Sequence, residues 1–350
     1  MAIHELEGII LQLTAPGKGI LAADESPTTM GKRLAVLQIE STVENRRCYR
    51  ELLFTTPGIE AFINGVILNE ETLYQKNKTG LPFPEFLDRQ GIVPGVKVDK
   101  GLISLNTEEK ITQGLDSLAE RLALYKNLGA KFAKWRAVFS ISATLPSSLA
   151  QVANAQALAR YASICQKSSI IPIVEPELLM DGDHSLERCL ETTENTLNTV
   201  FEELDKHHII LGCMLLKPSM VITGSKNYPQ ASISEVAKAT LEVLRRAVPT
   251  AVPSINFLSG GQTPELATAH LNEINKLKNP AHHPWHLSFS YGRALQEPAL
   301  KTWNGKAHNV QAAQRAFYKR AKLNAAACKG QYQANMETED KEAEPVFAAT

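Results

Sequence analysis

The feature that most constrains the fold is a regular alternation of short apolar runs with helical segments along the whole chain. Eight runs rich in β-branched and apolar residues have the length and composition of buried strands. They lie near residues 18–24, 62–69, 92–98, 132–138, 170–176, 211–217, 252–258 and 286–291. Between most of them apolar residues recur at helical spacing, as at Leu186, Leu190 and Leu197, which is typical of helices with one buried face.

Eight strands that alternate with helices in a 350-residue chain predict an α/β fold, a (β/α)8 TIM barrel. The alternative is an open doubly wound sheet. That fold is disfavoured because no Gly-x-Gly-x-x-Gly motif follows the first run. We expect a single barrel domain over residues 1–329, ending in a helix that begins after about residue 306, and a flexible polar tail over 330–350.

Charge and hydropathy exclude several classes of function. The 37 basic and 37 acidic residues cancel, so no electrostatic attraction to nucleic acid is expected. No run approaches the roughly 18 apolar residues of a membrane span, and the first ten residues lack a targeting pattern. We expect a cytoplasmic protein, with a mature organellar form as the alternative. The five cysteines are widely spaced and odd in number, which favours free thiols over disulfides or a zinc site.

Charged residues stand at the carboxyl ends of five of the runs, where a barrel of this kind carries its chemistry. They are Asp24 and Glu25, Lys97 and Asp99, Lys134 and Arg136, Glu175 and Glu177, and Lys217. Residues two apart on a strand face the same side, so each pair within one strand is expected to point one way. A single such charge is usually a solvated group or half of an ordinary ion pair. Five strand ends together predict an active site.

The last two runs end in glycines. Ser259-Gly260-Gly261 follows the seventh run, and Gly292-Arg293 follows the eighth. Glycine lets backbone N–H groups approach a ligand, and the loops after strands seven and eight are the usual phosphate site of this barrel. Arg293 would add a forked donor. A Gly-Gly pair alone is more often a turn, but the two ends together predict a phosphate-binding site.

Lys217 is the candidate nucleophile. It follows the apolar stretch 213–216, so the aliphatic part of its side chain is expected to lie among buried apolar residues. Burial disfavours the ammonium form, and a nearby cation such as Lys134 would favour the neutral amine, which can attack a ketone and form a Schiff base. The alternative is a plain ion pair with Glu175. Glu175 and Asp24 are carboxylates suited to the proton transfers that an imine mechanism needs.

No metal or cofactor is expected, because a protonated imine is itself the electron sink. No histidine stands at the carboxyl end of a predicted strand, where a metal-dependent barrel would place its ligands.

Seven motifs occur in one order along the chain: LAADES (21–26), GVKVDKG (95–101), FAKWR (132–136), IVEPE (173–177), LLKPSM (215–220), FLSGGQ (257–262) and SYGRALQ (290–296). In these motifs the chain resembles class I fructose-bisphosphate aldolases over residues 5–330. The resemblance implies reversible, metal-independent cleavage of fructose 1,6-bisphosphate to dihydroxyacetone phosphate and glyceraldehyde 3-phosphate in glycolysis and gluconeogenesis. It further implies a homotetramer, and it admits sedoheptulose 1,7-bisphosphate, a Calvin-cycle substrate.

The resemblance also implies a role for each matched residue. Lys217 matches the Schiff-base lysine, Glu175 the acid/base of dehydration, and Asp24 the base for the C4 hydroxyl. Lys134 matches the lysine that assists carbinolamine chemistry. Arg136 and Glu177 match supporting charged residues. The residues that match the site of the ketone-side phosphate are Ser259, Gly260, Gly292 and Arg293. Those that match positions near the far phosphate are Ser26, Lys32, Arg33 and Lys97.

Two departures from the family pattern leave questions open. Pro27-Thr28-Thr29 follows LAADES where Thr-Gly-Ser is common, which bears on the preference among bisphosphates and fructose 1-phosphate. The printed sequence closes on Thr350 where relatives commonly have a tyrosine that exchanges the C3 proton, so we expect that step to be slower or to use another group. Tyr332 is not expected to replace it. The alternative functions are a non-catalytic sugar-phosphate-binding scaffold and a metal-dependent aldolase or isomerase.

Overall fold

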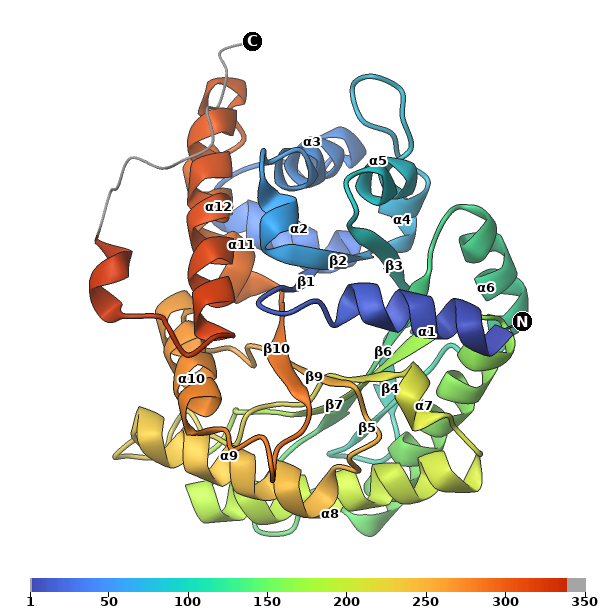
Figure 1. The fold of residues 1–350 in the computed structure, drawn as a ribbon, viewed down its shortest axis with the longest axis vertical. Helices are drawn as coiled ribbons and strands as arrows, with labels where there is room; N and C mark the ends of the chain where they lie inside the picture. Colours follow the sequence, from blue (N-terminus) through green and yellow to red (C-terminus); the bar gives the residue numbers. More distant parts are fainter. Residues whose placement is uncertain (1, 339–350) are drawn as a thin grey trace.

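In the computed structural model, which describes residues 2–338, eight parallel strands close into a barrel (Figure 1). The strands are β1 (Gly19–Ala23), β2 (Ile63–Leu68), β3 (Val93–Lys97), β6 (Phe132–Phe139), β7 (Ile171–Leu178), β8 (Leu215–Leu216), β9 (Ser254–Phe257) and β10 (His286–Tyr291). Each pairs with the next in this order, and β10 pairs with β1. The predicted TIM barrel is confirmed, and the open sheet is wrong because the first and last strands hydrogen-bond to each other.

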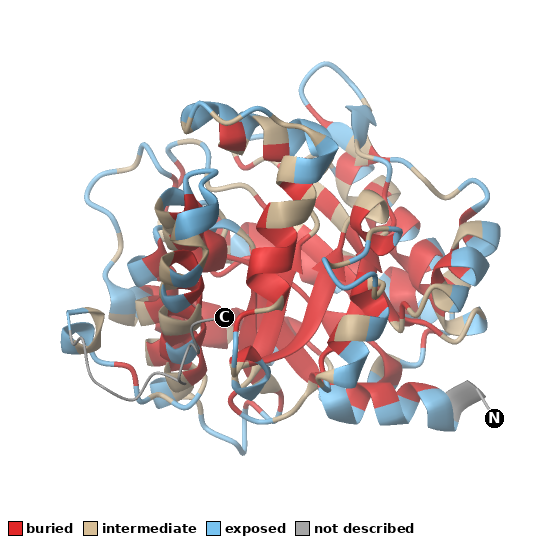
Figure 2. Ribbon diagram, turned by 90° about the horizontal axis from the view of Figure 1, so that it is seen from above, coloured by how far each residue is buried: buried red, intermediate tan, exposed pale blue. Residues whose placement is uncertain are grey.

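Helices surround the barrel, and their buried faces cover the strands (Figure 2). They are α2 (Pro27–Val36), α3 (Val43–Phe54), α4 (Glu70–Leu73), α5 (Phe83–Arg89), α6 (Leu118–Asn127), α7 (Ser148–Lys167), α8 (Leu186–Lys206), α9 (Ile233–Ala247), α10 (Pro264–Leu277), α11 (Arg293–Trp303) and α12 (Val310–Ala327). Several begin at a Ser, Thr or Asn that accepts a backbone hydrogen bond, and Ser232 and Glu235 form a full capping box at α9. Such caps satisfy donors that the first turn leaves free.

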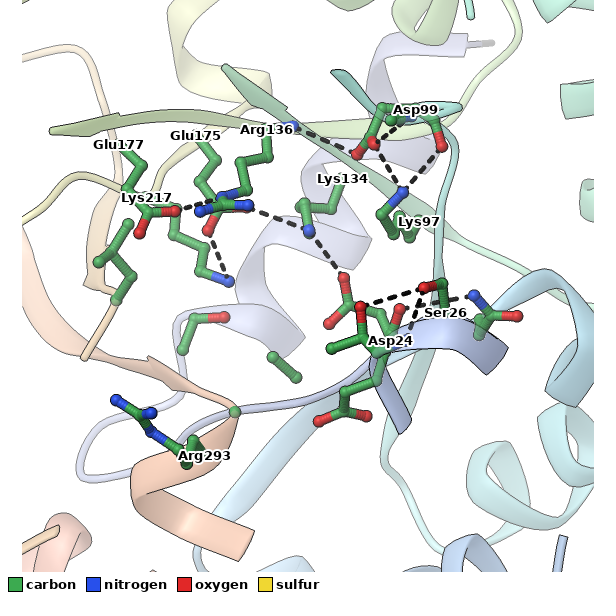
Figure 3. A pocket seen from close by; sticks show the side chains of 18 of the residues that line it. Asp24, Ser26, Lys97, Asp99, Lys134, Arg136, Glu175, Glu177, Lys217 and Arg293 are labelled. Atoms are coloured by element: carbon green, nitrogen blue, oxygen red, sulfur yellow. Dashed lines mark hydrogen bonds and ion pairs between the residues drawn. The ribbon is translucent and has the colours of Figure 1, made fainter. Parts of the chain in front are cut away.

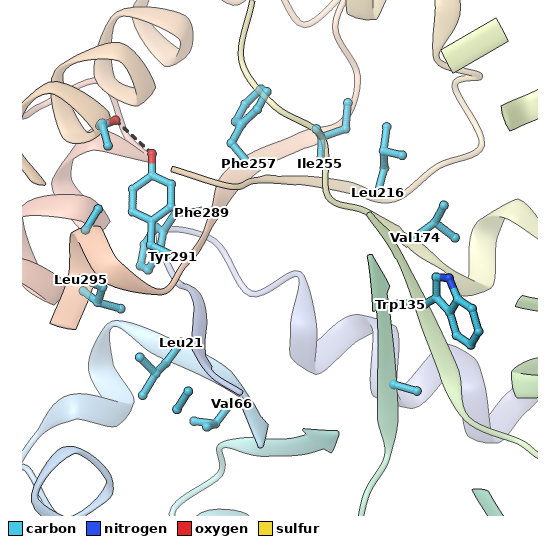
Figure 4. Packing of buried hydrophobic residues seen from close by; sticks show 14 of the residues in the cluster. Leu21, Val66, Trp135, Val174, Leu216, Ile255, Phe257, Phe289, Tyr291 and Leu295 are labelled. Carbon is cyan, nitrogen blue, oxygen red and sulfur yellow. Dashed lines mark hydrogen bonds between the residues drawn. The ribbon is translucent and has the colours of Figure 1, made fainter. Parts of the chain in front are cut away.

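Side chains of the strands alternate between two apolar clusters. Outward-facing residues such as Leu21, Trp135 and Val174 pack beneath the helices (Figure 4). Inward-facing residues such as Phe132 pack with the helix α1 (Ala2–Leu13) in a smaller cluster. Because α1 contacts the starts of the strands, it closes the amino-terminal end of the barrel, and the polar groups collect at the carboxyl end.

Two elements differ from the sequence prediction. The run 211–217 is not one strand: residues Leu211–Cys213 form a 3-10 turn, and β8 holds only two residues. The turn packs against α1 at the base of the barrel. A hairpin of β4 (Leu102–Ser104) and β5 (Lys110–Thr112) follows β3 and was not predicted. Its first strand is exposed along its whole length. The sequence therefore shows no alternation of apolar and polar residues there that would predict a strand.

The C-terminal helix is confirmed, preceded by a 3-10 turn over Ala307–Asn309. After it, the short turn Ala334–Glu337 docks on α12, where Arg320 Nη1 lies 2.5 Å from Glu337 Oε1. Residues 339–350 lie outside the described residues, so the boundary at 329 and the flexibility of the tail stay predictions. Within residues 2–338, no helix combines the length and the apolarity needed to cross a membrane.

Candidate active site

A cavity of about 970 Å³ opens at the carboxyl ends of the strands. Every site residue predicted from the sequence lines it except Lys32, which is exposed on α2. The charged ends of β1, β3, β6, β7 and β8 therefore meet in one place, because parallel strands of a barrel end at the same rim. The glycine-rich ends of β9 and β10 complete the wall.

Two lysines and two carboxylates form the centre of the cavity (Figure 3). Lys134 Nζ lies 2.7 Å from Asp24 Oδ2 and 3.2 Å from Glu175 Oε2. Lys217 Nζ lies 3.1 Å from Glu175 Oε1. Lys134, Lys217 and Glu175 are each only 4% exposed. Glu175 thus bridges the two amines in a largely water-excluded place, which strengthens every charge interaction there.

The strands fix these positions. Residues of β6 and β7 pair along their whole length, with Arg136 opposite Glu175, so Lys134 and Glu175 lie on neighbouring strands within reach of each other. Lys217 directly follows β8, and its backbone N–H donates to Val174 O at 2.8 Å. The preceding Leu215 and Leu216 are fully buried. The predicted apolar surroundings of Lys217 and the alternative ion pair with Glu175 are therefore both present.

The carboxylates of this cluster are held in their charged form. Burial acts to raise the pKa of Asp24, but Lys134 and Lys217 more than offset it and hold that pKa well below its usual range. Burial opposes ionisation of Glu175 in the same way, and Lys134, Lys217 and Arg136 lower its pKa overall. Burial acts to lower the pKa of Lys134, yet the surrounding carboxylates raise it. At neutral pH the cluster holds charged Asp24, Glu175 and Lys134.

At one end of the cavity, near β1 to β3, each cation has a carboxylate partner. Arg33 Nη1 lies 2.5 Å from Glu25 Oε1, and this pair also borders Gly292, because Glu25 Oε1 lies 4.0 Å from a Cβ placed on that glycine. Lys97 Nζ lies 2.5 Å from Asp99 Oδ1. Beside them, Lys100 Nζ lies 2.7 Å from the carboxylate of Glu70. We call this the paired end.

The amino terminus of α2 also faces the paired end. Ser26 Oγ accepts a hydrogen bond from Thr29 N at 3.2 Å and donates one to Thr29 Oγ1 at 3.1 Å. Thr29 lines the cavity, so the departure from the family pattern at residues 27–29 lies at the site itself.

The opposite end, by β9 and β10, is built from a turn and an arginine, and we call it the open end. Gly260 and Gly261 have φ of 54° and 88°, a left-handed backbone that favours glycine. Gln262 N donates to Ser259 O at 3.0 Å and closes the turn. A Cβ added to Gly261 would lie 3.4 Å from Arg293 Nη2. No ion pair of Arg293 occurs among residues 2–338, which leaves its guanidinium available to an anion.

Sequence reasoning missed some residues of the cavity. Ser290 lines it, is 1% exposed, and its hydroxyl has no hydrogen-bond partner in the described part of the chain. A buried unpartnered hydroxyl that faces a cavity is a group available to a ligand. The period of two that pairs Ser290 with Gly292 could have revealed it. Glu70, just after the second run, is a further strand-end charge that was overlooked.

All five cysteines are free thiols. Among residues 2–338, no three His, Cys, Asp or Glu side chains gather in an arrangement that could hold a metal ion. Tyr332 lies away from the cavity, is 6% exposed, and donates its hydroxyl to Glu337 Oε1 at 3.0 Å.

Comparisons with known proteins agree with the geometry. The family model of class I fructose-bisphosphate aldolase matches residues 5–350. A non-muscle fructose-bisphosphate aldolase of Lethenteron camtschaticum is 53% identical over 331 residues, 94% of this chain and 90% of that protein. Cytosolic fructose-bisphosphate aldolase 6 of Arabidopsis thaliana is 52% identical, over 91% of this chain and 88% of the relative. The crystal structure of Plasmodium falciparum fructose-bisphosphate aldolase, solved with TRAP and an inhibitor, is similar at a TM-score of 0.92, with 48% identity and coverage of 95% and 96%.

Proposed function

This chain belongs to the class I fructose-bisphosphate aldolase family, and from that premise we propose that Lys217 is the amine that forms an imine with the ketone of fructose 1,6-bisphosphate. The activity is that of a lyase of glycolysis and gluconeogenesis. The observation that carries the residue assignment is the bridge of Glu175 between Lys134 and Lys217 inside the cavity. It supplies a nucleophile, an acid and a fixed cation at one point.

Imine formation begins with the contact between Lys217 and Glu175. Transfer of one proton from Lys217 Nζ to Glu175, across 3.1 Å, leaves a neutral amine and a protonated acid. The amine attacks the C2 carbonyl and gives a carbinolamine. Glu175 then returns its proton to the departing hydroxyl, and water leaves as the protonated imine forms. Lys134 stays charged and stabilises the developing oxyanion beside it.

Cleavage uses the other carboxylate. Asp24, charged and held by Lys134 at 2.7 Å, takes the proton of the C4 hydroxyl. The C3–C4 bond breaks, its electron pair moves into the protonated imine to give an enamine, and the aldehyde half is released. Protonation at C3 and hydrolysis of the imine then free the ketone half and restore Lys217.

The two ends of the cavity orient the substrate for these steps. Arg293, Gly260, Gly292 and Ser259 line the open end and would bind the ketone-side phosphate. Ser26, Arg33 and Lys97 line the paired end and would bind the far phosphate. Lys32, exposed on α2, would contribute only long-range attraction. Arg136 holds Glu177 beside the reacting groups.

The alternative of a non-catalytic sugar-phosphate scaffold does not account for the central cluster. Burying two lysines with two carboxylates costs desolvation free energy, and phosphate binding at the two ends would not require that central cluster. The buried bridge therefore favours catalysis over simple binding.

Borohydride trapping tests the assignment of Lys217. Reduction in the presence of dihydroxyacetone phosphate should add one adduct to the peptide that contains Lys217. Lys217→Ala should remove the adduct and lower kcat by at least about 10⁴-fold, in line with loss of a covalent nucleophile. Lys278→Ala is the control, because Lys278 is a half-buried lysine that lies outside the cavity. An adduct on another lysine, or one that persists in Lys217→Ala, contradicts the assignment.

A cytoplasmic location and a homotetramer are further parts of the proposal. The relative from Arabidopsis is named cytosolic, which supports the first. Light scattering of the purified chain tests the second, and a mass of a monomer or dimer would contradict it. Steady-state rates on fructose 1,6-bisphosphate, fructose 1-phosphate and sedoheptulose 1,7-bisphosphate rank the substrates.

A further inference from the structure

A buried hydrogen bond lies directly behind the turn of the open end. His270, in α10, places Nδ1 2.6 Å from Gln262 Oε1. The two side chains are only 3% and 5% exposed, and neither lines the cavity. The reaction steps above make no use of this contact, yet Gln262 is the last residue of the turn that carries Gly260 and Gly261.

The chemistry of the contact fixes which atom donates. An amide oxygen only accepts, so Nδ1 of His270 carries the proton and donates it to Gln262 Oε1. The other ring nitrogen, Nε2, has no partner in the described part of the chain. A second proton there would be buried without an acceptor, and burial lowers the pKa of His270 to about 4. At neutral pH His270 is a neutral, single donor.

Gln262 is held from its other side as well. Its Nε2 lies 3.8 Å from Met220 Sδ, and Met220 is 1% exposed in the loop that follows Lys217. The side chain of Gln262 is therefore fixed between α10 and that loop. Because its own backbone N–H closes the turn onto Ser259 O, fixing the side chain fixes the end of the turn.

A turn of two glycines needs such an external restraint. Glycine populates both signs of φ with little penalty, so the left-handed conformations of Gly260 and Gly261 are not enforced by their own side chains. Gly261 also lies against Arg293, with only 3.4 Å between Nη2 and a Cβ placed there. A small rotation of the turn would move its N–H groups relative to the guanidinium, and the two would no longer converge on one anion.

We propose that His270 is a positioning residue for phosphate binding: through Gln262 it holds the glycine turn in register with Arg293, so that the ketone-side phosphate meets backbone N–H groups and guanidinium together. The inference rests on the proposed assignment of the open end to that phosphate. His270 touches neither substrate nor reacting atoms, and its effect is confined to the phosphate.

The test compares two ketones in borohydride trapping at Lys217: dihydroxyacetone phosphate and dihydroxyacetone, which lacks the phosphate. His270→Leu removes the donor at similar volume. Its half-saturating concentration of dihydroxyacetone phosphate should rise about five- to twentyfold, the usual effect of leaving a buried acceptor unpaired. The value for dihydroxyacetone should stay unchanged. His270→Asn, which keeps an N–H donor where Nδ1 stands, should restore tight binding of dihydroxyacetone phosphate.

Two controls separate positioning from plain stability. His283→Leu removes a comparably buried histidine that accepts a hydrogen bond from Asn279 N beyond the far end of α10. This variant should lower Tm without changing the half-saturating concentration of either ketone. If His270→Leu does not fold, Gln262→Leu removes the same hydrogen bond from the other side and should reproduce the phosphate-selective effect. Equal changes for both ketones, or none, would overturn the role of His270.

Arg293→Ala distinguishes this inference from the proposed function. If Arg293→Ala leaves binding of dihydroxyacetone phosphate intact, the phosphate assignment of the open end is wrong, and the inference falls with it. If Arg293→Ala weakens that binding while His270→Leu does not, only the positioning role is wrong.

Discussion

The two ends of the cavity hold their cations in different ways. At the open end, Arg293 has no ion-pair partner among residues 2–338 and stands against the glycine turn. At the paired end, Arg33, Lys97 and Lys100 each lie within 2.7 Å of a carboxylate oxygen. The first end presents a free donor set to an anion, whereas the second presents cations whose charge is already shared.

This difference teaches how one cavity can bind the two halves of a substrate unequally. An anion at the open end gains charge-assisted hydrogen bonds without displacing a partner. An anion at the paired end competes with Glu25, Asp99 and Glu70 for the same cations, so its net gain is smaller. The proposed reaction benefits, because the ketone half stays bound to Lys217 while the aldehyde half has to leave.

The largest change in KM is expected from loss of Arg293, which tests the difference between the two ends most directly. Arg293→Ala should raise KM for both fructose 1,6-bisphosphate and fructose 1-phosphate by about 10- to 100-fold, the range for removal of a charged hydrogen-bond donor. The matched variant Lys97→Met should raise KM for the bisphosphate by less than about tenfold and leave fructose 1-phosphate unchanged. Steady-state kinetics with both substrates measure this. Equal effects of the two variants would contradict the asymmetry.

A smaller, opposite effect should follow from freeing a cation at the paired end. Asp99→Asn keeps the acceptor that Gly101 N uses at 3.2 Å but removes the charge that holds Lys97. We expect KM for fructose 1,6-bisphosphate to fall about two- to fivefold, because Lys97 no longer shares its charge, with fructose 1-phosphate as the unaffected control. A higher KM would mean that Asp99 places Lys97 for the phosphate rather than competing with it.

The smallest effect is a difference in the pH dependence of stability between His270, behind the open end, and the central carboxylates Asp24 and Glu175. Burial lowers the pKa of His270 from 6.5 to about 4. As pH falls, this ring is therefore protonated in the unfolded chain before it is protonated in the folded chain. The stability that the neutral ring contributes, on the order of 3 kcal/mol, is lost as pH falls from 6.5 toward 4. The pKa values of Asp24 and Glu175 are lowered too, so their contribution is lost only below about pH 4.

Denaturant unfolding of the whole chain between pH 3 and 7.5 measures both contributions. His270→Asn should reduce, but not abolish, the loss of unfolding free energy between pH 6.5 and 4, because burial also lowers the pKa of His286 to about 4. It should leave the loss below pH 4. Asp24→Asn should do the reverse. A His270→Asn curve parallel to that of the unchanged chain would show that the ring does not titrate as its burial requires.

The fold was largely predictable from local patterns. Buried parallel strands read as continuous apolar runs, and seven of the eight predicted runs agree with the strands to within two residues. The exception is β8, where the run 211–217 begins as a 3-10 turn. Packing of α1 at the base of the barrel decides that turn, and α1 lies some two hundred residues away in the sequence.

The site was predictable where its residues end strands, and not elsewhere. Lys217, Glu175 and Asp24 follow apolar runs, so their meeting at one rim follows from the barrel alone. Lys32 directly precedes Arg33 in the sequence but stays outside the cavity, because neighbours on a helix point in different directions. His270 carried no signal at all, since it lies within a helix and acts on a residue eight positions earlier.

The sequence by itself determined the closed barrel, the rim where the charged groups collect and the types of those groups, because strand periodicity and apolar length are local properties. Only the tertiary structure decided which charges pair and which stay free. Lys97 and Arg293 are both cations at strand ends, yet one meets Asp99 and the other meets a turn of glycines. That outcome depends on distances of a few ångströms between segments far apart in the chain, and Coulomb energies and desolvation change steeply over such distances.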